Sequence, residues 1–408
     1  MATFIVLGCV GLVGILVILL LRIPIKYNAR NLVVRWITSA MTVTGIALVT
    51  WVFVILFALG IGMENTLVTT AHPLNLVVIR SGSQSETNSS VSKEQAASVM
   101  NLDGIEKDDR GEPLVSPEVV VVANQPKLDG RKSNLAMRGV GPKARALRGN
   151  IRIVEGRWFN PGVGELVVGK AIAGRFKDLK VGDKPFIRGR PWEIVGVFTA
   201  DGQAYESEAW GDLVDLCTQF KRENSCSSLI VRCTAVDQVA RLARVIKDDK
   251  SVKLDGLTQA EYYKGQNQGV LMMKAMGVVM AFVLSIGAIF GAANTMYAAV
   301  ASRIREIATM RVLGFGSASI WFSFMLEAGF LGLLGGILGS VFGRLTVHGQ
   351  TTGTANWQTF SEMAFQFQVT LPLMGWGIVL AVAMGAIGGF FPAFRASRQT
   401  IAAALRGL

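Results

Sequence analysis

The chain has 408 residues, of which 51% are hydrophobic, and it carries a formal net charge of +12. Charged residues make up only 17% of the chain, and the apolar residues fall into long blocks instead of spreading evenly. This pattern excludes an ordinary soluble globular domain and favours a protein embedded in a membrane.

Five blocks with almost no charge are long enough to cross a bilayer, which takes about 20 apolar residues in a helix. They cover residues 1–21, 36–63, 275–302, 312–343 and 364–394. The first block predicts an extra transmembrane helix at residues 1–22. It could instead be a cleaved signal peptide, and "VLGC" at 6–9 loosely resembles a lipoprotein acylation site. Because no basic region precedes the block and no A-x-A site follows it, an uncleaved anchor is the favoured interpretation.

The second and third blocks, 36–63 and 275–302, each contain 28 residues without a charge. A helix of that length reaches roughly 42 Å, well beyond the roughly 30 Å of the hydrocarbon core. Such helices either tilt strongly or project from the bilayer as stalks. Because the two flank a long polar segment, the stalk interpretation predicts that movement at one end is felt at the other.

The polar segment between them, 64–268, has about 205 residues, enough to bury a core of its own. Its runs of alternating and helical periodicity predict an α+β domain. The strand-like runs are "LVSPEVVVVANQ", "SNLAMRGV", "GELVVGKAI" and "PWEIVGVFT", and the helix-like runs are "EQAASVMNLDGI", "DLVDLCTQF" and "VDQVARLARVIKDD". The segment has no G-x-S-x-G or H-E-x-x-H pattern, and two histidines in the whole chain offer no His-based metal site. Nothing in it therefore argues for catalysis.

Three cysteines fall in this segment: Cys217, Cys226 and Cys233. In an oxidising compartment Cys217 and Cys226 could form a disulfide that joins a helix end to the following strand. Three free thiols are an equally good interpretation of the same sequence.

The fourth block combines glycines at four-residue spacing with one ionisable residue. Glycine at this spacing lets two helix backbones approach closely in lipid, either within one subunit or between two copies. The glycines are Gly332, Gly335, Gly336, Gly339 and Gly343. Glu327 stands alone in the block. Because no second carboxylate or histidine in the spans continues a proton path, a structural or hinge contact is favoured over ion coupling.

Between the third and fourth blocks, "SRIREIATMRVLGFG" at 302–316 predicts a short amphipathic helix. Its apolar residues are Ile304, Ile307, Ala308 and Leu313, and its charged residues are Arg303, Glu306 and Arg311. Such a helix can bury the apolar stripe in a partner while the charges fix its register. The alternative is a helix that lies on anionic lipid headgroups, which the basic excess would also favour.

The distribution of Lys and Arg in the short connections predicts the orientation, because cytoplasmic loops carry the positive excess. The connections 22–35 and 302–316 and the tail from residue 395 are basic, whereas 345–372 contains neither Lys nor Arg. We therefore expect the N-terminus and the polar domain outside, the C-terminus in the cytoplasm, and an odd number of spans.

The stretch "REIATMRVLGFGSASIWFSFMLEAGFLGLLGGILG" resembles the cytoplasmic loop and following span of MacB/LolC/FtsX-type ABC transporter permeases. The positions that match their pattern are Arg303, Glu306, Ile307, Arg311, Leu313, Gly314, Glu327 and Gly335–Gly336. The end of the chain is similar to their closing signature at Pro392, Ala393, Ala396, Ala404, Leu405 and Arg406. "MRGV", "EGRWF", "GELVVGKAIAGRF", "VGDKPFI" and "EIVGVF" follow the MacB-like extracytoplasmic core domain. The resemblance covers residues 24–408, and the extra N-terminal span departs from it.

The resemblance implies a membrane α-helical protein with four core spans plus the extra N-terminal span, and an α+β extracytoplasmic domain. Residues 24–63 would form an amphipathic cytoplasmic segment and the first permease span, 64–268 a MacB-like domain, and 269–408 an FtsX-like domain with three spans and a cytoplasmic tail. Residues 302–316 would be a coupling helix that docks into a separate ATP-binding subunit. The residues it implies for that role are Arg303, Arg305, Glu306, Ile307, Met310, Arg311, Leu313 and Gly314.

The chain has no G-x-x-x-x-G-K-[ST] pattern, so we expect no enzyme activity and no bound cofactor here, with ATP and Mg²⁺ held by a partner P-loop ATPase. The resemblance further implies a second permease copy in a homodimer, a periplasmic adaptor (membrane fusion protein), a bacterial inner-membrane location and no nucleic-acid partner. ATP hydrolysis would move the extracytoplasmic domain, by mechanotransmission, for efflux or extraction of a substrate. The alternative is an FtsX-like transmitter that regulates a cell-wall hydrolase. The coupling-helix pattern argues against a membrane receptor unrelated to ABC transporters.

Overall fold

The computed structural model describes residues 34–266, 268–355 and 361–399, which fall into two compact units. The helical unit is drawn from Met1–Gly60, Met273–Gly349 and Phe367–Leu408, and the sheet unit consists of Ile61–Met272 and Gln350–Gln366. The predicted helix at 1–22 and the end of the predicted C-terminal tail lie outside the described residues.

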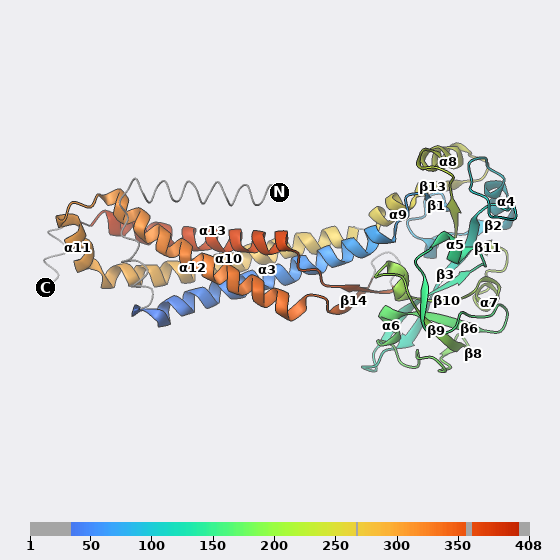
Figure 1. Ribbon diagram of the computed structural model, residues 1–408, viewed down its shortest axis with the longest axis horizontal. Helices are drawn as coiled ribbons and strands as arrows, with labels where there is room; N and C mark the ends of the chain where they lie inside the picture. The colour runs from blue at the N-terminus through green and yellow to red at the C-terminus, as the bar shows by residue number, and fades with distance from the viewer. Residues whose placement is uncertain (1–33, 267, 356–360, 400–408) are drawn as a thin grey trace. The chain divides into compact units, whose positions relative to one another are not determined.

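Four helices in the described part of the chain are long and apolar enough to cross a membrane. They are α3 (Trp36–Thr70), α10 (Gln268–Ser302), α12 (Ser317–Val347) and α13 (Leu371–Ser397). A helix satisfies its own backbone hydrogen bonds, which is what an apolar run inside a bilayer requires. Figure 1 shows α12 beside α13, and the short helix α11 (Ile304–Val312) at the turn between α10 and α12.

The sheet unit is built on a nine-stranded mixed sheet with the strand order β13-β1-β12-β3-β4-β10-β6-β9-β5. Its strands are β1 (Asn75–Arg80), β3 (Val115–Pro126), β4 (Lys132–Val140), β5 (Arg152–Gly156), β6 (Glu165–Gly169), β9 (Glu193–Thr199), β10 (Glu208–Asp212), β12 (Ser228–Arg232) and β13 (Leu254–Thr258). Neighbouring strands are antiparallel except in the pairs β4–β10 and β6–β9. Two small pairs accompany the sheet: β2 (Val91–Ser92) with β11 (Ser225–Cys226), and β7 (Phe186–Ile187) with β8 (Arg190–Pro191).

Short helices cover this sheet. They are η1 (Glu86–Asn88), α4 (Lys93–Met100), α5 (Ala144–Leu147), α6 (Lys170–Ala173), η2 (Ala204–Ser207), α7 (Leu213–Gln219), α8 (Val236–Asp248) and α9 (Gln259–Gly265). Helix α8 shows why they pack: Val239, Leu242 and Ile246 recur at helical spacing and are buried in one cluster with Leu76 and Leu229 of the sheet. A second apolar cluster, around Trp192, packs under α6 and α7.

The segment between α12 and α13 contains a β-hairpin that belongs to the sheet unit, which the sequence did not predict. Its strands are β14 (Thr351–Ala355) and β15 (Glu362–Gln366). The buried carboxylate of Glu362 lies 3.0 Å from Lys127 Nζ and 3.1 Å from Arg175 Nε. Two cations thus hold the hairpin against the rest of the sheet unit.

The predicted fold class is confirmed, since four apolar helices that could span a membrane are joined to an α+β domain. The runs predicted as strands at 114–125, 133–140 and 191–199 coincide closely with β3, β4 and β9. The run predicted as a helix at 236–249 coincides with α8.

Candidate coupling site

Helix α11 is a separate nine-residue helix between two long apolar helices. Arg303, with φ of −108°, interrupts the helical conformation after Ser302. At the other end Gly314 has φ of +91°, a left-handed conformation that glycine adopts without steric strain. The backbone N–H of Phe315 donates to the carbonyl of Met310 at 3.0 Å and closes the helix end. Gly314 therefore sets the C-terminal end of α11.

One face of α11 packs into the helical unit itself. Ile307 and Ala308 are buried, and Met310 packs against the same apolar cluster. The other members of this cluster are Met296, Val300, Ile320, Phe324, Ala328, Ala393 and Ala396. The middle of the predicted apolar stripe is therefore used inside this chain and is not presented to a partner.

The opposite face of α11 is exposed. Val312 and Leu313 are 66% and 72% exposed, which is high for large apolar side chains. Arg305 and Glu306 are exposed on the same helix, and Gly314 follows with its backbone accessible. Apolar side chains bordered by charges have the composition of a protein interface, with an apolar centre and a polar rim.

Two arginines attach α11 to α12. Arg303 and Glu327 form a bidentate pair in which Nη1 and Nη2 donate to the two carboxylate oxygens, each at 2.8 Å. Both side chains are only 4% exposed. At the other end of α11, Arg311 donates to the hydroxyl of Ser317. The helix is thus held at both ends to the start and the first half of α12.

This pairing corrects the predicted docking role of Arg303, because its guanidinium is buried against Glu327. It also gives Glu327 the structural contact that the sequence favoured, and the partner, Arg303, lies just after the end of α10. Arg303 directly follows an apolar block and was predicted to contact a partner with the other charges of this helix, so its inward direction left no signal in the sequence. A buried guanidinium needs a fully hydrogen-bonded anion, and the bidentate geometry supplies one.

The glycines of α12 face two different helices of the same chain. A Cβ atom at Gly332 would lie 2.5 Å from the carbonyl oxygen of Ala381 in α13, and one at Gly339 would lie 2.4 Å from that of Ala47 in α3. Gly336 also faces α13, and Gly335 and Gly343 face α3. These glycines therefore pack helices within one subunit, where no larger side chain fits without a shift of the backbone.

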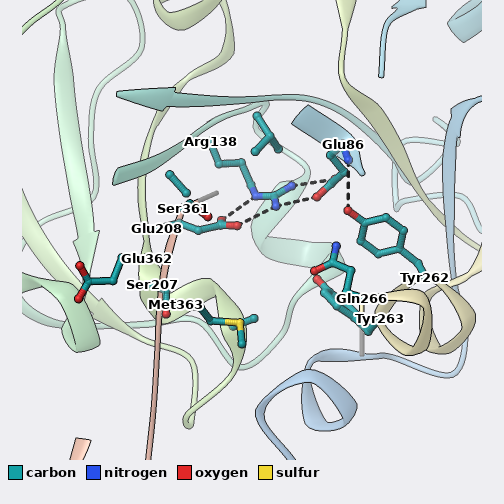
Figure 2. Close-up of a pocket in the computed structure, with 13 residues that line it drawn as sticks. Glu86, Arg138, Ser207, Glu208, Tyr262, Tyr263, Gln266, Ser361, Glu362 and Met363 are labelled. Atoms are coloured by element: carbon teal, nitrogen blue, oxygen red, sulfur yellow. Dashed lines mark hydrogen bonds and ion pairs between the residues drawn. The ribbon is translucent and has the colours of Figure 1, made fainter. Parts of the chain in front are cut away.

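The sheet unit contains a buried cluster of charges that the sequence did not predict. Figure 2 shows Arg138 of β4 between the carboxylates of Glu86 and Glu208. Its guanidinium lies 2.9 Å from Glu86, 2.8 Å from Glu118 and 2.7 Å from Glu208. A second buried guanidinium, from Arg148, contacts Glu118 at 2.6 Å. Each charge is thus compensated, as burial requires.

Electrostatics keep this cluster ionised. Burial alone would raise the pKa of Glu86, but the Arg138 guanidinium and hydrogen bonds from Arg138 and Ser228 lower it below its ordinary value. The pKa of Arg138 is likewise held well above its ordinary value by the surrounding carboxylates, although burial opposes this. The cavity beside the cluster has a volume of about 50 Å³, enough for a few waters at most. The cluster links three elements of the sheet unit, namely η1, β4 and β10, through buried ion pairs.

The cysteines of the sheet unit are free thiols, so the structure agrees with the second of the two interpretations that the sequence left open, and the possible Cys217–Cys226 disulfide is not formed. The Sγ of Cys226 instead donates to the carbonyl of Val91 at 3.6 Å, while Cys217 lies on α7. Burial raises the pKa of Cys226 to about 12, which keeps this thiol protonated and unreactive. Both thiols line a hollow of about 530 Å³ with residues of α4 and α7.

No group of three or more His, Cys, Asp and Glu side chains within residues 34–266, 268–355 and 361–399 is placed to hold a metal ion. In the same part of the chain, the exposed face of α11 combines charged and large apolar side chains: Arg305, Glu306, Val312 and Leu313.

Two family models match the chain: the MacB-like periplasmic core domain over residues 39–249, and the FtsX-like permease C-terminal domain over residues 278–401. An uncharacterized ABC transporter permease of Methanocaldococcus jannaschii is 24% identical over 266 residues, 62% of this chain and 65% of the relative. The macrolide export ATP-binding/permease protein MacB of Hyphomonas neptunium is 29% identical over 265 residues, 60% of this chain and 38% of the relative. The chain thus spans less than two thirds of the length of either relative.

Solved structures show weaker similarity. The periplasmic region of MacB from Actinobacillus actinomycetemcomitans aligns with a TM-score of 0.36 and 10% identity, over 49% of this chain and 96% of that one. The extracellular domain of the ABC-type transporter YknZ from Gram-positive bacteria aligns with a TM-score of 0.34 and 17% identity, over 45% of this chain and 99% of that one. Scores in this range support no inference about function.

Proposed function

Because the chain belongs to the family of the MacB-like periplasmic core domain, joined to an FtsX-like permease domain, we propose that it is the membrane permease of an ABC transporter. In this role a separate P-loop ATPase, which holds ATP and Mg²⁺, docks on α11. Its hydrolysis cycle moves the sheet unit, and the sheet unit acts on a substrate at the outer face of the membrane. The 408 residues contain no P-loop pattern, and in this proposal the partner supplies the nucleotide chemistry.

The observation that carries this proposal is the exposed face of α11. Val312 and Leu313 form an apolar centre that a partner can bury, and Arg305 and Glu306 can fix the register of the contact. The neighbouring connections that are rich in Lys and Arg favour a cytoplasmic position for this helix. A cytoplasmic ATPase would meet it there.

The two attachments of α11 explain how a force on it reaches the rest of the helical unit. The Arg303–Glu327 pair and the Arg311–Ser317 hydrogen bond hold both ends of α11 to α12. A displacement of α11 therefore moves α12 with it instead of bending a loop. The close glycine contacts carry that movement from α12 to α3 and α13, because tightly packed helices transmit strain.

We place the protein in the bacterial inner membrane as a homodimer, with the sheet unit outside and the C-terminus in the cytoplasm. The large apolar side chains on α10 support a surface covered by lipid or by a second copy. They include Leu271, Met276, Val279, Phe282 and Phe290, each more than half exposed. Substrate export or extraction, with a periplasmic adaptor as partner, completes the proposal.

Affinity purification of the intact protein from its native membrane, with mass spectrometry of the copurifying proteins, tests this role. We expect a P-loop ATPase in near-equal amount, and an adaptor beside it. Leu313→Asp and Arg305→Glu should each remove the ATPase, whereas Lys247→Glu on the exposed face of α8 should retain it. Absence of any ATPase in several detergents would overturn the proposal. Recovery of a cell-wall hydrolase in place of an adaptor would favour the alternative role, in which the protein regulates that hydrolase and does not transport a substrate.

A further inference from the structure

Six consecutive residues of the sheet unit, 203–208, contact each part of that unit that continues into a membrane helix. We call them the junction segment. It comprises Gln203, the 3₁₀ helix η2 and Glu208 at the start of β10. The Glu206 carboxylate fixes its shape by accepting hydrogen bonds from the Thr199 hydroxyl at 2.6 Å and the Ala200 N–H at 2.7 Å. The segment is therefore a rigid turn and not a loose loop.

The first two residues of the junction segment bind the end of α3. The side-chain amide of Gln203 donates to the carbonyl oxygen of Thr69 at 2.7 Å. The backbone N–H of Ala204 donates to the hydroxyl of Thr70 at 2.8 Å, and Thr70 is the last residue of the helix. A shift of the α3 terminus thus acts directly on the segment.

The third residue binds α9, the helix that precedes α10. The hydroxyl of Tyr205 accepts a hydrogen bond from Gln259 Nε2 at 2.8 Å and another from the Tyr263 hydroxyl at 3.0 Å. Gln259 Oε1 in turn accepts from the backbone N–H of His72 at 2.8 Å. One buried amide therefore joins the chain that leaves α3 to the chain that enters α10.

The last residues bind the hairpin and the charge cluster. Ser207 Oγ accepts from the N–H of Ala364 in β15 at 2.9 Å and donates to the carbonyl of the same residue at 3.3 Å. Glu208 forms two hydrogen bonds with Arg138, at 2.7 and 2.8 Å. In Figure 2 Ser207, Glu208 and Tyr263 line the same small cavity beside Arg138.

We propose that the junction segment positions the sheet unit in response to movement of the membrane helices, with Ser207 as its contact to the α12–α13 hairpin. This proposal rests on the proposed permease function and assigns the transmission step to named residues. Buried polar contacts suit such a role, because a broken bond leaves an unsatisfied group and the network prefers a few discrete arrangements. Adjacency alone does not establish coupling, so the test has to separate transmission from stability.

The chain offers a matched control. Ser227 Oγ accepts from the N–H of Val120 at 2.9 Å and donates to its carbonyl at 3.3 Å, the same geometry as Ser207 with Ala364. Both serines are buried, at 0% and 4% exposure. Ser227 makes these bonds within the core of the sheet unit, and its hydrogen-bond partners in the described part of the chain, Val120, Arg222 and Glu118, lie outside the segments that lead to a membrane helix. Ser227→Ala therefore removes the same pair of bonds as Ser207→Ala, together with one that Ser227 Oγ accepts from Arg222 Nη1 at 3.1 Å, without touching the junction segment.

The experiment is hydrogen–deuterium exchange on the full chain, in nanodiscs with the ATPase that copurifies with it. Protection of the β4 and β10 amides is compared between the ADP state and the ATP–vanadate state. We expect a nucleotide-dependent difference in the wild type and in Ser227→Ala. In Ser207→Ala it should be about fivefold smaller, the factor that one hydrogen bond of ordinary strength supplies, at an unchanged ATPase rate. Gln203→Ala, a change at the surface, should also reduce it and covers the case in which Ser207→Ala fails to fold.

If the nucleotide-dependent difference in amide protection is the same in Ser207→Ala, Gln203→Ala and Ser227→Ala, the role of the junction segment is overturned while the permease function stays intact. No difference in the wild type, with the ATPase bound and active, would overturn the proposed transmission itself. The two failures are therefore distinguishable.

Discussion

The buried pair of Arg303 and Glu327 gives the sharpest prediction about the helical unit. Its members are 2.8 Å apart and 4% exposed, so water does not solvate either charge when the other is removed. Loss of one partner from a buried pair costs about 3–5 kcal/mol. For a unit of this size, that corresponds to a fall in melting temperature of roughly 6–20 °C. We expect a fall in this range for Arg303→Met and for Glu327→Leu.

The double variant Arg303→Met/Glu327→Leu should melt close to the wild type. A buried pair replaced by apolar side chains of similar volume is often neutral or stabilising, because the desolvation of both charges disappears with their attraction. The two losses should therefore be strongly non-additive, with a coupling free energy of about 3 kcal/mol or more.

The assay is thermal unfolding of the full chain in detergent at one scan rate, followed by tryptophan fluorescence. Arg305→Met is the control, because Arg305 lies on the same helix but is exposed. If Arg303→Met melts within about 2 °C of that control, or if the double variant is as unstable as the sum of the singles, the buried pair does not support α11.

Three further outcomes follow from the contacts of single residues. Gly339→Ala should destabilise the helical unit by about 1–3 kcal/mol, because the added Cβ would lie 2.4 Å from a carbonyl oxygen of α3. Gly329→Ala should instead stabilise the unit by about 0.5–1 kcal/mol, because a Cβ there would meet no atom within 4 Å. Thermal unfolding of both variants measures these changes. Cys217 should react with a maleimide at pH 8 at least about tenfold faster than Cys226, because Cys226 is more buried and its pKa is raised to about 12. Mass spectrometry of the alkylated chain gives both rates. Equal rates would contradict the burial of Cys226. The lowered pKa of Glu86 means that its ionised form stabilises the fold above its ordinary pKa of 4.5, and that this contribution is lost as the pH falls through the lower folded value. Stability of Glu86→Gln should therefore fall less steeply than that of the wild type below about pH 4.5, and parallel acid unfolding curves would refute this.

The long helices could be predicted from the sequence because each one is a continuous apolar run, and length and charge alone decide whether such a run spans a bilayer. The faces of α11 could not. A nine-residue helix has only about two turns, and its sequence predicts an apolar stripe for which a partner and a lipid surface were both open interpretations. In the structure Ile307 is buried against other helices of the same chain, whereas Leu313 is exposed. The side of a short amphipathic helix that packs against its own protein depends on tertiary contacts, which the periodicity of the sequence does not predict.

The hairpin shows a different limit. In the sequence, the connection 345–372 is distinguished by its lack of Lys and Arg. In the structure, Glu362 within it pairs with Lys127 and Arg175. The local sequence indicates only an acidic loop, because Arg175 and Lys127 lie about 190 and 235 residues before Glu362 in the chain. The assignment of this segment to the sheet unit depends on that distant pairing.

The buried charges of the sheet unit follow the same rule, and they bear on its function. Arg138 lies on β4, Glu86 in the short helix η1, and Glu208 at the end of the junction segment. Each residue alone is a typical surface charge, and only closure of the whole cluster makes burial acceptable. Such a cluster tolerates few intermediate geometries, because any shift leaves a buried charge unpaired. In the proposed function the sheet unit moves as one body, and a rigid charge cluster that includes Glu208 of the junction segment would resist its deformation.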